Sequence, residues 1–519
     1  MLHTPEAVRN AYDTLATRRA FLARHAGGLG AIALASLLAD SRAATAVEPA
    51  NTGAAARVPA RDRAIANDRA HATATATATA TANANANAAV LAAPRATAKR
   101  VVCLFQHGGP SQMDLFDPKP LLQKHHGQPY PGGPLEIHFD KQKGNVLGSP
   151  FKFRRYGQSG MEMSELLPRI GELADQITLV RSMTTESVDH ESALRLIHTG
   201  RFLAGMPVWG SWLLYALGTL NANLPAYVVL SDPGGLPVDG ERNWSSGWLP
   251  ATYAGVPFRS GRSPVLNLTP PATLATNSAA RENQLRFLQR LNGQFRDRHP
   301  EASELAARIE HFETAARMQG AVGEALDLSR EPAHVRELYG LDRDPTREYG
   351  ARCLMARRLL ERGVRFVQLF LQGQPWDTHS RNAESLKGLC ARTDQPSAAL
   401  VTDLRQRGLL DDTIVLWTGE FGRLPVSQGA DGRDHNRHGF SLWLAGGGFR
   451  AGYTHGATDD FGYRSVENVV TVHDLHATLL AALGIDHRRL THPHEGRDAS
   501  LTDVDVTKAK PVPSLLGSG

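Results

Sequence analysis

Apolar runs without polar alternation recur along the chain, and each opens into a loop rich in glycine and polar residues. Such runs are typical of strands that are covered on both faces. Stretches with helical periodicity lie between them, and this alternation predicts an α/β fold with a mainly parallel sheet flanked by helices. The predicted strands are residues 100–106, 177–183, 226–231, 364–371, 413–417 and 440–444. The predicted helices are residues 161–175, 189–200, 353–362, 397–407 and 472–484.

The loops after two of these strands carry carboxylates and imidazoles. Glu420 stands between two glycines just past strand 413–417, and the polar loop that follows ends at His435. Asp377 and His379 follow strand 364–371, and because they are two residues apart in an extended segment they can face the same side. Open α/β sheets bind ligands at the carboxyl ends of their strands. We therefore expect these four side chains to help hold a metal ion.

Further candidates follow the first two strands. The first strand opens into a loop that contains His107, Ser111 and Asp114, although Asp114 could instead cap a short helical turn. His190 lies in the first turn of the predicted helix 189–200. If the N-terminus of that helix is directed at the site, it favours an anion such as sulfate or phosphate. The alternative is that His190 only caps or packs there.

Size and composition narrow the class of protein. A chain of 519 residues with 42% hydrophobic residues can bury a large core. The net charge of +5 is small for this length and no dense block of Lys and Arg stands out in the folded part, which argues against a nucleic-acid partner. Three widely spaced cysteines form neither a metal-binding pair nor a disulfide framework, and Cys103 is expected in the core.

The N-terminal region predicts export. Arg18-Arg19 followed by an Ala/Gly/Leu-rich run resembles a twin-arginine signal, so residues 1–46 are expected to be a signal peptide and the protein to be periplasmic or extracellular. Residues 47–99 are of low complexity, which predicts a disordered linker. One folded domain, 100–505, is expected to follow, with a helical insertion at 280–340 and a poorly ordered tail at 506–519. No later segment predicts a transmembrane helix.

Six stretches together resemble a bacterial family known as domain of unknown function 1501. The resemblance runs from about residue 100 to 503. That family is similar in turn to the alkaline phosphatase and sulfatase superfamily, which implies an alkaline phosphatase/sulfatase-like fold and hydrolysis of phosphate or sulfate esters with one or two metal ions. The stretches are FQHGGPSQMDLFDPKP, DHESALRLIHTGR, WDTHSRN, TGEFGRLP, GRDHNRHGFSLWLAGGGFRAG and TVHDLHATLLAALGI.

The superfamily pattern implies roles for single residues. Glu420 takes the place of an Asp-His ligand pair, Asp377 and His379 resemble a second ligand pair with closer spacing, and His435 resembles a final ligand. The acidic ligand expected directly after the first strand is replaced by His107-Gly108, and the nearest carboxylate is Asp114.

The place of the superfamily's nucleophile, nine residues before a Thr-Gly pair, holds His190. A hydroxyl nucleophile is therefore missing from the expected position. Three explanations stay open: His190 attacks covalently, it is a metal ligand beside an activated water, or the site only binds.

The sequence thus favours an exported hydrolase of a sulfate or phosphate ester that depends on a divalent metal ion, which could be zinc, manganese, calcium or iron. Asp377, His379 and His435 would hold one ion, and Asp114, His190 and Glu420 would form a second set. Arg423 or Arg181 would bind the anion of a small-molecule or polysaccharide ester. The alternative is a non-catalytic sulfatase-like protein that binds anionic polysaccharide, or an assembly partner, at the cell surface.

Overall fold

The structure is a computed structural model that describes residues 96–139, 141, 143–259, 278–299, 309, 313–314, 317–318, 323 and 325–517. These residues belong to the compact unit Ala80–Gly519. The predicted signal peptide, 1–46, lies outside the described residues, as do most of the predicted linker and parts of the predicted insertion at 280–340. None of the helices among the described residues has the length and hydropathy needed to cross a membrane.

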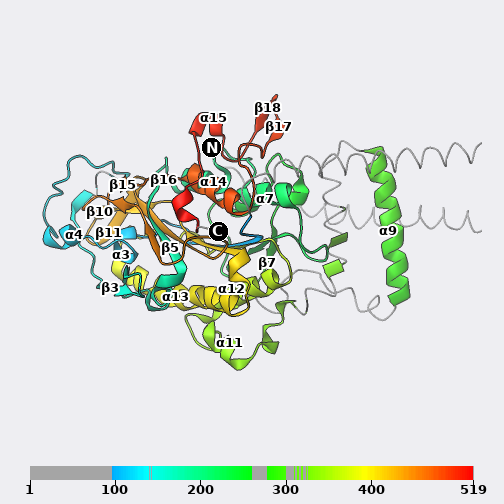
Figure 1. Cartoon of the computed structure of the whole chain (residues 1–519), viewed down its shortest axis with the longest axis horizontal. Coiled ribbons are helices and arrows are strands. Elements are labelled where there is room, and N and C mark those ends of the chain that lie inside the picture. The colour runs from blue at the N-terminus through cyan, green and yellow to red at the C-terminus, as the bar shows by residue number, and fades with distance from the viewer. Residues whose placement is uncertain are drawn as a thin grey trace, which may run out of the picture. The chain divides into compact units, whose positions relative to one another are not determined.

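A mixed sheet forms the centre of the described part of the chain (Figure 1). Its order is β13-β5-β12-β9-β1-β8-β6-β7, with β16 paired to β5, so nine strands of the described residues belong to it. Only β12 runs antiparallel to its neighbours, β5 and β9. The predicted mainly parallel sheet is confirmed. The strands are β1 (Arg100–Phe105), β5 (Ile177–Thr184), β6 (Tyr227–Leu230), β7 (Val256–Phe258), β8 (Phe366–Leu369), β9 (Thr413–Thr418), β12 (Phe440–Ala445), β13 (Tyr453–His455) and β16 (Val470–Thr471).

Helices cover both faces of the sheet, which explains why its strands lack polar alternation. In β1, Val102 and Leu104 join one hydrophobic core with α12 and α13, whereas Val101, Cys103 and Phe105 join another with α6, α7 and α14. Figure 1 shows α12 and α13 on one side of the sheet and α7 and α14 on the other. The main helices are α6 (His190–Thr199), α7 (Trp209–Leu217), α9 (Ser278–Arg298), α11 (Ala333–Leu338), α12 (Arg347–Glu361), α13 (Asn382–Gln406) and α14 (Val472–Ala482).

Two predictions of local structure were wrong. Residues 161–175 were expected to be helical, but β4 (Met161–Ser164) pairs with β3 (Phe153–Tyr156), and only the short α5 (Pro168–Gly171) follows. Proline is disfavoured in a helix interior and is well tolerated at its first position, so Pro168 begins a helix here and does not continue one.

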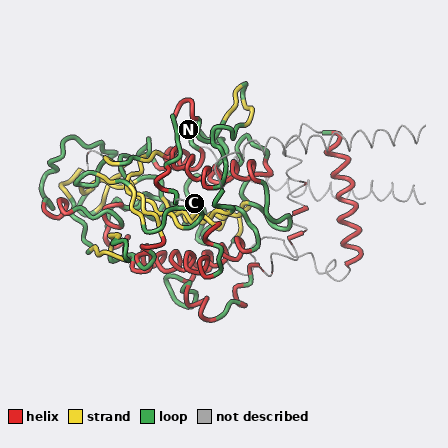
Figure 2. Tube along the Cα trace, in the orientation of Figure 1, coloured by secondary structure: helices red, strands yellow, loops and turns green. Residues whose placement is uncertain are grey.

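The segment between β9 and β12 was expected to be a polar loop. It contains β10 (Gly422–Gln428) and β11 (Gly432–Asn436), which form an antiparallel sheet with β2 (Lys143–Val146). In Figure 2, strand is drawn where Figure 1 labels β10 and β11. Most of the polar residues on these two strands are buried, namely Arg423, Gln428, Arg433, Asp434, His435 and Asn436, so their polarity does not indicate exposure. The remaining short elements are α3 (Gln112–Leu115), α4 (Pro120–Lys124), β14 (Ala457–Thr458), β15 (Ser465–Glu467), β17 (His492–His494), β18 (Arg497–Ala499) and α15 (Val504–Thr507).

The C-terminal segment differs from the expected poorly ordered tail. Leu515 is fully buried, and Leu516 forms a β-bridge with Phe449. The backbone N–H of Gly517 also donates to the carbonyl of Gly448, 2.8 Å away. Apolar burial and backbone pairing therefore fix this segment to the domain.

We expect Leu515→Ala to lower the free energy of unfolding by about 2–4 kcal/mol, because it removes a fully buried side chain and leaves a cavity. Val506→Ala, at a position that is 73% exposed, should change it by less than about 0.5 kcal/mol. Urea unfolding followed by circular dichroism measures both values. Equal, small effects of the two substitutions would show that the segment does not pack on the domain.

Candidate metal centre

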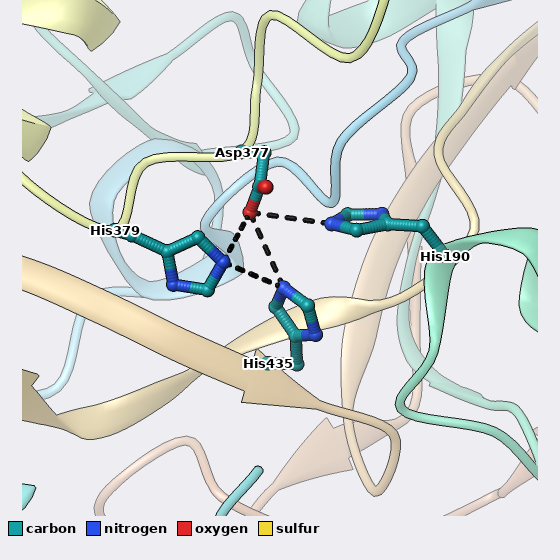
Figure 3. Close-up of side chains that lie close together, drawn as sticks. All are labelled: His190, Asp377, His379 and His435. Carbon is teal, nitrogen blue, oxygen red and sulfur yellow. Dashed lines mark hydrogen bonds and ion pairs between the residues drawn. The ribbon is translucent and has the colours of Figure 1, made fainter. Parts of the chain in front are cut away.

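Four predicted site residues meet at the carboxyl edge of the sheet (Figure 3). His190 begins α6, Asp377 and His379 lie in the loop after β8, and His435 lies on β11. Each offers one ligand atom, and the four atoms lie within 4.8 Å of one another. We call these four residues the four-ligand cluster. Segments that are up to 245 residues apart in the chain thus contribute to one site.

The Asp377 carboxylate is the common partner in this cluster. Its Oδ1 lies 2.9 Å from Nε2 of His379 and 3.2 Å from Nε2 of both His190 and His435. The Nε2 atoms of His379 and His435 are 3.0 Å apart. All three imidazoles therefore direct the same ring nitrogen at one point beside the carboxylate.

The other ring nitrogens determine which tautomers are present. Nδ1 of His435 lies 2.6 Å from the carbonyl oxygen of Val188, and Nδ1 of His379 is hydrogen bonded to the side-chain oxygen of Gln428. Because both partners are acceptors, each Nδ1 carries the proton and donates. A neutral ring then has a bare lone pair on Nε2, which is the state required of a metal ligand.

His190 is oriented in the same way by a carboxylate. Its Nδ1 donates to Oε1 of Glu420 over 2.6 Å, and both side chains are buried. Three lone pairs and the Asp377 oxygen consequently converge, and acceptors this close repel one another unless a positive charge lies between them. Either a proton or a metal ion can supply that charge. This set of ligands fits a divalent ion.

The helix that carries His190 is fixed at both ends. The Asp189 carboxylate accepts from the backbone N–H of Ser192 at the N-terminus, and Gly200 ends the helix with a left-handed φ of 69°. At the C-terminal end, Nε2 of His473 donates to the carbonyl of Gly200 and Nε2 of His476 donates to that of Ile197. These two histidines therefore act as polar partners behind the site.

Glu420, which was predicted to be a ligand, lies outside the four-ligand cluster and behind His190. Its carboxylate accepts from the backbone N–H of Gly108 at 2.9 and 3.2 Å and from His190, so it orients an imidazole. Burial alone would raise the pKa of Glu420, but His107 and His190 lower it to about 2. His107 is fully buried 3.9 Å from this carboxylate and could complete a smaller group with Glu420 and His190.

Asp114 is not part of the four-ligand cluster, so its assignment as a ligand is corrected. It forms a buried bidentate ion pair with Arg433, with distances of 2.7 and 3.1 Å. Ser111 and Asn382 also donate to this carboxylate. Burial would raise the pKa of Asp114, but the charge and hydrogen bonds of Arg433 lower it. The carboxylate serves to neutralise a buried guanidinium.

Arg423 is not available to bind an anion, contrary to prediction. Its guanidinium is fully buried and donates to the carbonyl oxygens of Gly108, Gly109 and Arg433 and to Oδ1 of Asp377, the last over 2.7 Å. Its role is to position the carboxylate of the cluster.

The alternative anion-binding residue, Arg181, points elsewhere. Its guanidinium donates to the carbonyl of Glu162 over 3.2 Å and lies 3.9 Å from Asp117. Neither arginine that the sequence suggested is therefore free to hold a substrate anion.

The charges of the cluster depend on one another. Burial alone would raise the pKa of Asp377, but its contacts with His190, His379 and His435 and the charge of Arg423 lower it well below its usual range. Burial would lower the pKa of His190, but Asp377 and Glu420 raise it to about 9. Burial lowers the pKa of His435 to about 4. Without a metal, His190 is therefore protonated at neutral pH and adds a positive charge to the cluster.

The two acceptors that fix the tautomers of His379 and His435 were not predicted from the sequence. Val188 acts through its main-chain carbonyl, which leaves no trace in residue type, and Gln428 lay in a segment that was expected to be a loop. A sequence signal was available only for Gln428, because it falls seven residues before His435 in a possible hairpin.

Comparison with known proteins identifies the family. The family model described as "Protein of unknown function (DUF1501)" matches residues 98–516, and the chain belongs to that family. None of the curated proteins compared with the chain matches it.

Solved structures with a related fold include sulfatases and a phosphonate hydrolase. The PsFucS1 sulfatase from Pseudoalteromonas sp. is 12% identical, with 78% of this chain and 72% of that chain covered and a TM-score of 0.32. The phosphonate monoester hydrolase SpPMH from Silicibacter pomeroyi is 10% identical, with 80% and 77% covered and a TM-score of 0.31. At identities this low, the likeness concerns the fold and does not extend to activity.

Metal binding should release a proton from His190. Because the pKa of this residue is raised to about 9, the metal-free site is protonated at pH 7.5, and an ion that binds Nε2 must displace that proton. We expect the apparent affinity for Zn²⁺ or Mn²⁺ to rise about tenfold per pH unit up to about pH 9 and then to level off. Titration calorimetry in two buffers with different ionisation enthalpies measures the proton release. An affinity that is constant between pH 7 and 9 would contradict this assignment.

Proposed function

We propose that this member of the DUF1501 family is an exported metal-dependent hydrolase that cleaves a sulfate or phosphate ester by direct attack of water. The observation that carries the proposal is the four-ligand cluster, in which three imidazoles donate from Nδ1 to acceptors outside the site and turn Nε2 toward Asp377. A metal ion requires each imidazole to keep a proton on Nδ1 and a free lone pair on Nε2. A site that binds no metal has no such requirement.

The ligand set narrows the choice of ion. Calcium and magnesium prefer oxygen ligands, so three imidazoles favour zinc, manganese or iron among the ions that the sequence allows. Four protein ligands would complete a tetrahedral zinc site, so hydrolysis requires an ion that accepts a fifth or sixth ligand. A bound divalent ion would polarise the ester oxygen and lower the pKa of a water molecule.

The protein's own groups complete the site. Arg423 holds Asp377 in place through a 2.7 Å ion pair, and Glu420 holds the ring of His190. The positive end of the ten-residue helix α6 lies at His190, which favours an anionic substrate beside the cluster. The anion is thus attracted by the helix and the metal ion, since neither predicted arginine is free.

The geometry favours His190 as a ligand over His190 as a covalent nucleophile. Its Nδ1 is occupied by Glu420, and its Nε2 lies 3.2 Å from Asp377 inside the cluster. An attacking nitrogen would have to leave that position. Among the three explanations for the missing hydroxyl, the one in which water attacks fits best.

Metal analysis and an ester screen test the proposal together. The protein should bind one ion per chain by mass spectrometry of the metal content and should hydrolyse aryl sulfate or aryl phosphate esters. Asp377→Ala should abolish both properties. Glu420→Gln should weaken the metal affinity about 10- to 100-fold, because it removes only the group that orients His190. The matched control is Glu191→Gln, the next residue on α6, whose carboxylate pairs with Arg195 at the surface and which should behave like the wild type.

Two results would separate the alternatives. Metal binding without turnover on any ester would support the non-catalytic, polysaccharide-binding alternative. Failure to bind stoichiometric metal, with Asp377→Ala unchanged in stability, would exclude a metal centre altogether.

We also propose that the protein is exported by the twin-arginine route and is periplasmic or extracellular. Arg18-Arg19 and the apolar run after them support this proposal. Replacing both residues by lysine should keep the protein in the cytoplasm with its N-terminal segment uncleaved. Cell fractionation and mass measurement of the N-terminus give the readout. Export of the double variant at the wild-type level would exclude this route.

A further inference from the structure

A short segment outside the predicted site lies against the imidazoles of the four-ligand cluster. We call residues 136–139 the strap. The ring of His138 stacks on that of His435 at a centroid distance of 5.1 Å and an angle of 20°. The ring of Phe139 stands perpendicular to that of His379 at 5.1 Å and lies 6.2 Å from that of His435.

Hydrogen bonds and ion pairs attach the strap to the strand that carries His435. The backbone N–H groups of His138 and Phe139 both donate to Oδ2 of Asp434, over 2.9 and 2.8 Å. The other oxygen of Asp434 accepts from the backbone N–H of His435. One carboxylate therefore fixes the strap relative to a ligand of the cluster, so the position of Phe139 is set by the site itself.

The other end of the strap is attached as well. The Glu136 carboxylate accepts from Arg437 over 2.9 Å and from His438 over 2.8 Å. The backbone N–H of Glu136 donates to the hydroxyl of Tyr463. The strap is thus held at both ends by side chains of the β11–β12 region and of the segment that follows β14.

Exposure indicates the side from which a substrate arrives. The side chain of His379 is 28% exposed, compared with 12% for Asp377 and 4% for His435. Phe139, which contacts the most exposed ligand, is itself 40% exposed. The solvent-facing side of the cluster is therefore flanked by a large apolar ring that is only half covered.

We propose that Phe139 determines substrate specificity by stacking on a ring in the alcohol part of the ester, so that the substrates are esters of sugars or aromatic alcohols and not of small acyclic alcohols. This inference rests on the proposed function, because it assumes that the anion binds at the cluster. The flat apolar face of a pyranose or an aryl group can cover the exposed ring of Phe139, and removal of both surfaces from water stabilises the complex. An acyclic, hydrated alcohol offers no such face.

Binding of ligands that cannot be hydrolysed tests the inference without turnover. The metal-loaded full chain would be titrated calorimetrically with phenylphosphonate, cyclohexylphosphonate and methylphosphonate, and with the corresponding sulfonates. We expect the two ring compounds to bind about tenfold more tightly than the methyl compound. In Phe139→Ala this preference should disappear while the metal content stays at the wild-type level, and Phe139→Trp should restore it.

The matched control is Phe202→Ala. Phe202 is also 40% exposed but follows the C-terminal end of α6, and its removal should leave the ring preference intact. A preference only for phenylphosphonate would indicate aryl esters, and one for both rings would indicate that sugars are accepted.

The outcomes distinguish this inference from the proposed function. Ring preference that depends on Phe139, found together with absence of turnover, would support the inference as a property of a binding site and would overturn hydrolysis. Turnover with equal affinity for ring and methyl compounds would overturn the inference and leave hydrolysis in place. Absence of binding by all the phosphonates and sulfonates would overturn the inference as well.

Discussion

The buried guanidinium of Arg423 connects the parts of the site. It donates to the carbonyls of Gly108 and Gly109 after β1, to Arg433 on β11 and to the Asp377 carboxylate after β8. A buried charge is costly unless it is paired and fully hydrogen bonded, and this network meets both conditions. The loops after β1 and β8 and the ligand strand β11 must therefore adopt one relative position for the arginine to be satisfied. The same requirement fixes Asp377, on which the imidazoles converge.

The sequence predicted the central strands, the helix that carries His190 and the four cluster residues, because these depend on local signals. Apolar runs predict buried strands, and the carboxyl ends of parallel strands meet at one edge. The wrong predictions for Asp114 and Arg423 arise from interactions that are not local in the chain. Asp114 and Arg423 have residue types suited to a metal and an anion, but Asp114 neutralises Arg433 more than 300 positions away, and Arg423 binds backbone carbonyls. Long-range pairing of this kind leaves no pattern along the chain.

The position of Glu420 changes how the family motif is understood. In the superfamily that the motifs resemble, the position of Glu420, after a late strand, holds metal ligands. The position of His190, on a helix, holds the nucleophile. Here the glutamate is hydrogen bonded to His190, and His190 turns its second nitrogen to the cluster. The two departures lie in contact, because the ring of His190 fills the space between the Glu420 carboxylate and Asp377 of the cluster.

The place of β1 in the sheet has a consequence for synthesis in the cell. β1 lies between β8 and β9, and its residue Arg100 pairs with Thr413, roughly 300 residues later. At about 5–20 residues per second, about 15–60 s pass before both neighbours of this apolar strand have been translated. Until β8 has been translated, neither edge of β1 has its native partner, which exposes the nascent chain to aggregation. Folding of the sheet is therefore a late event, and it becomes possible only after most of the chain has left the ribosome.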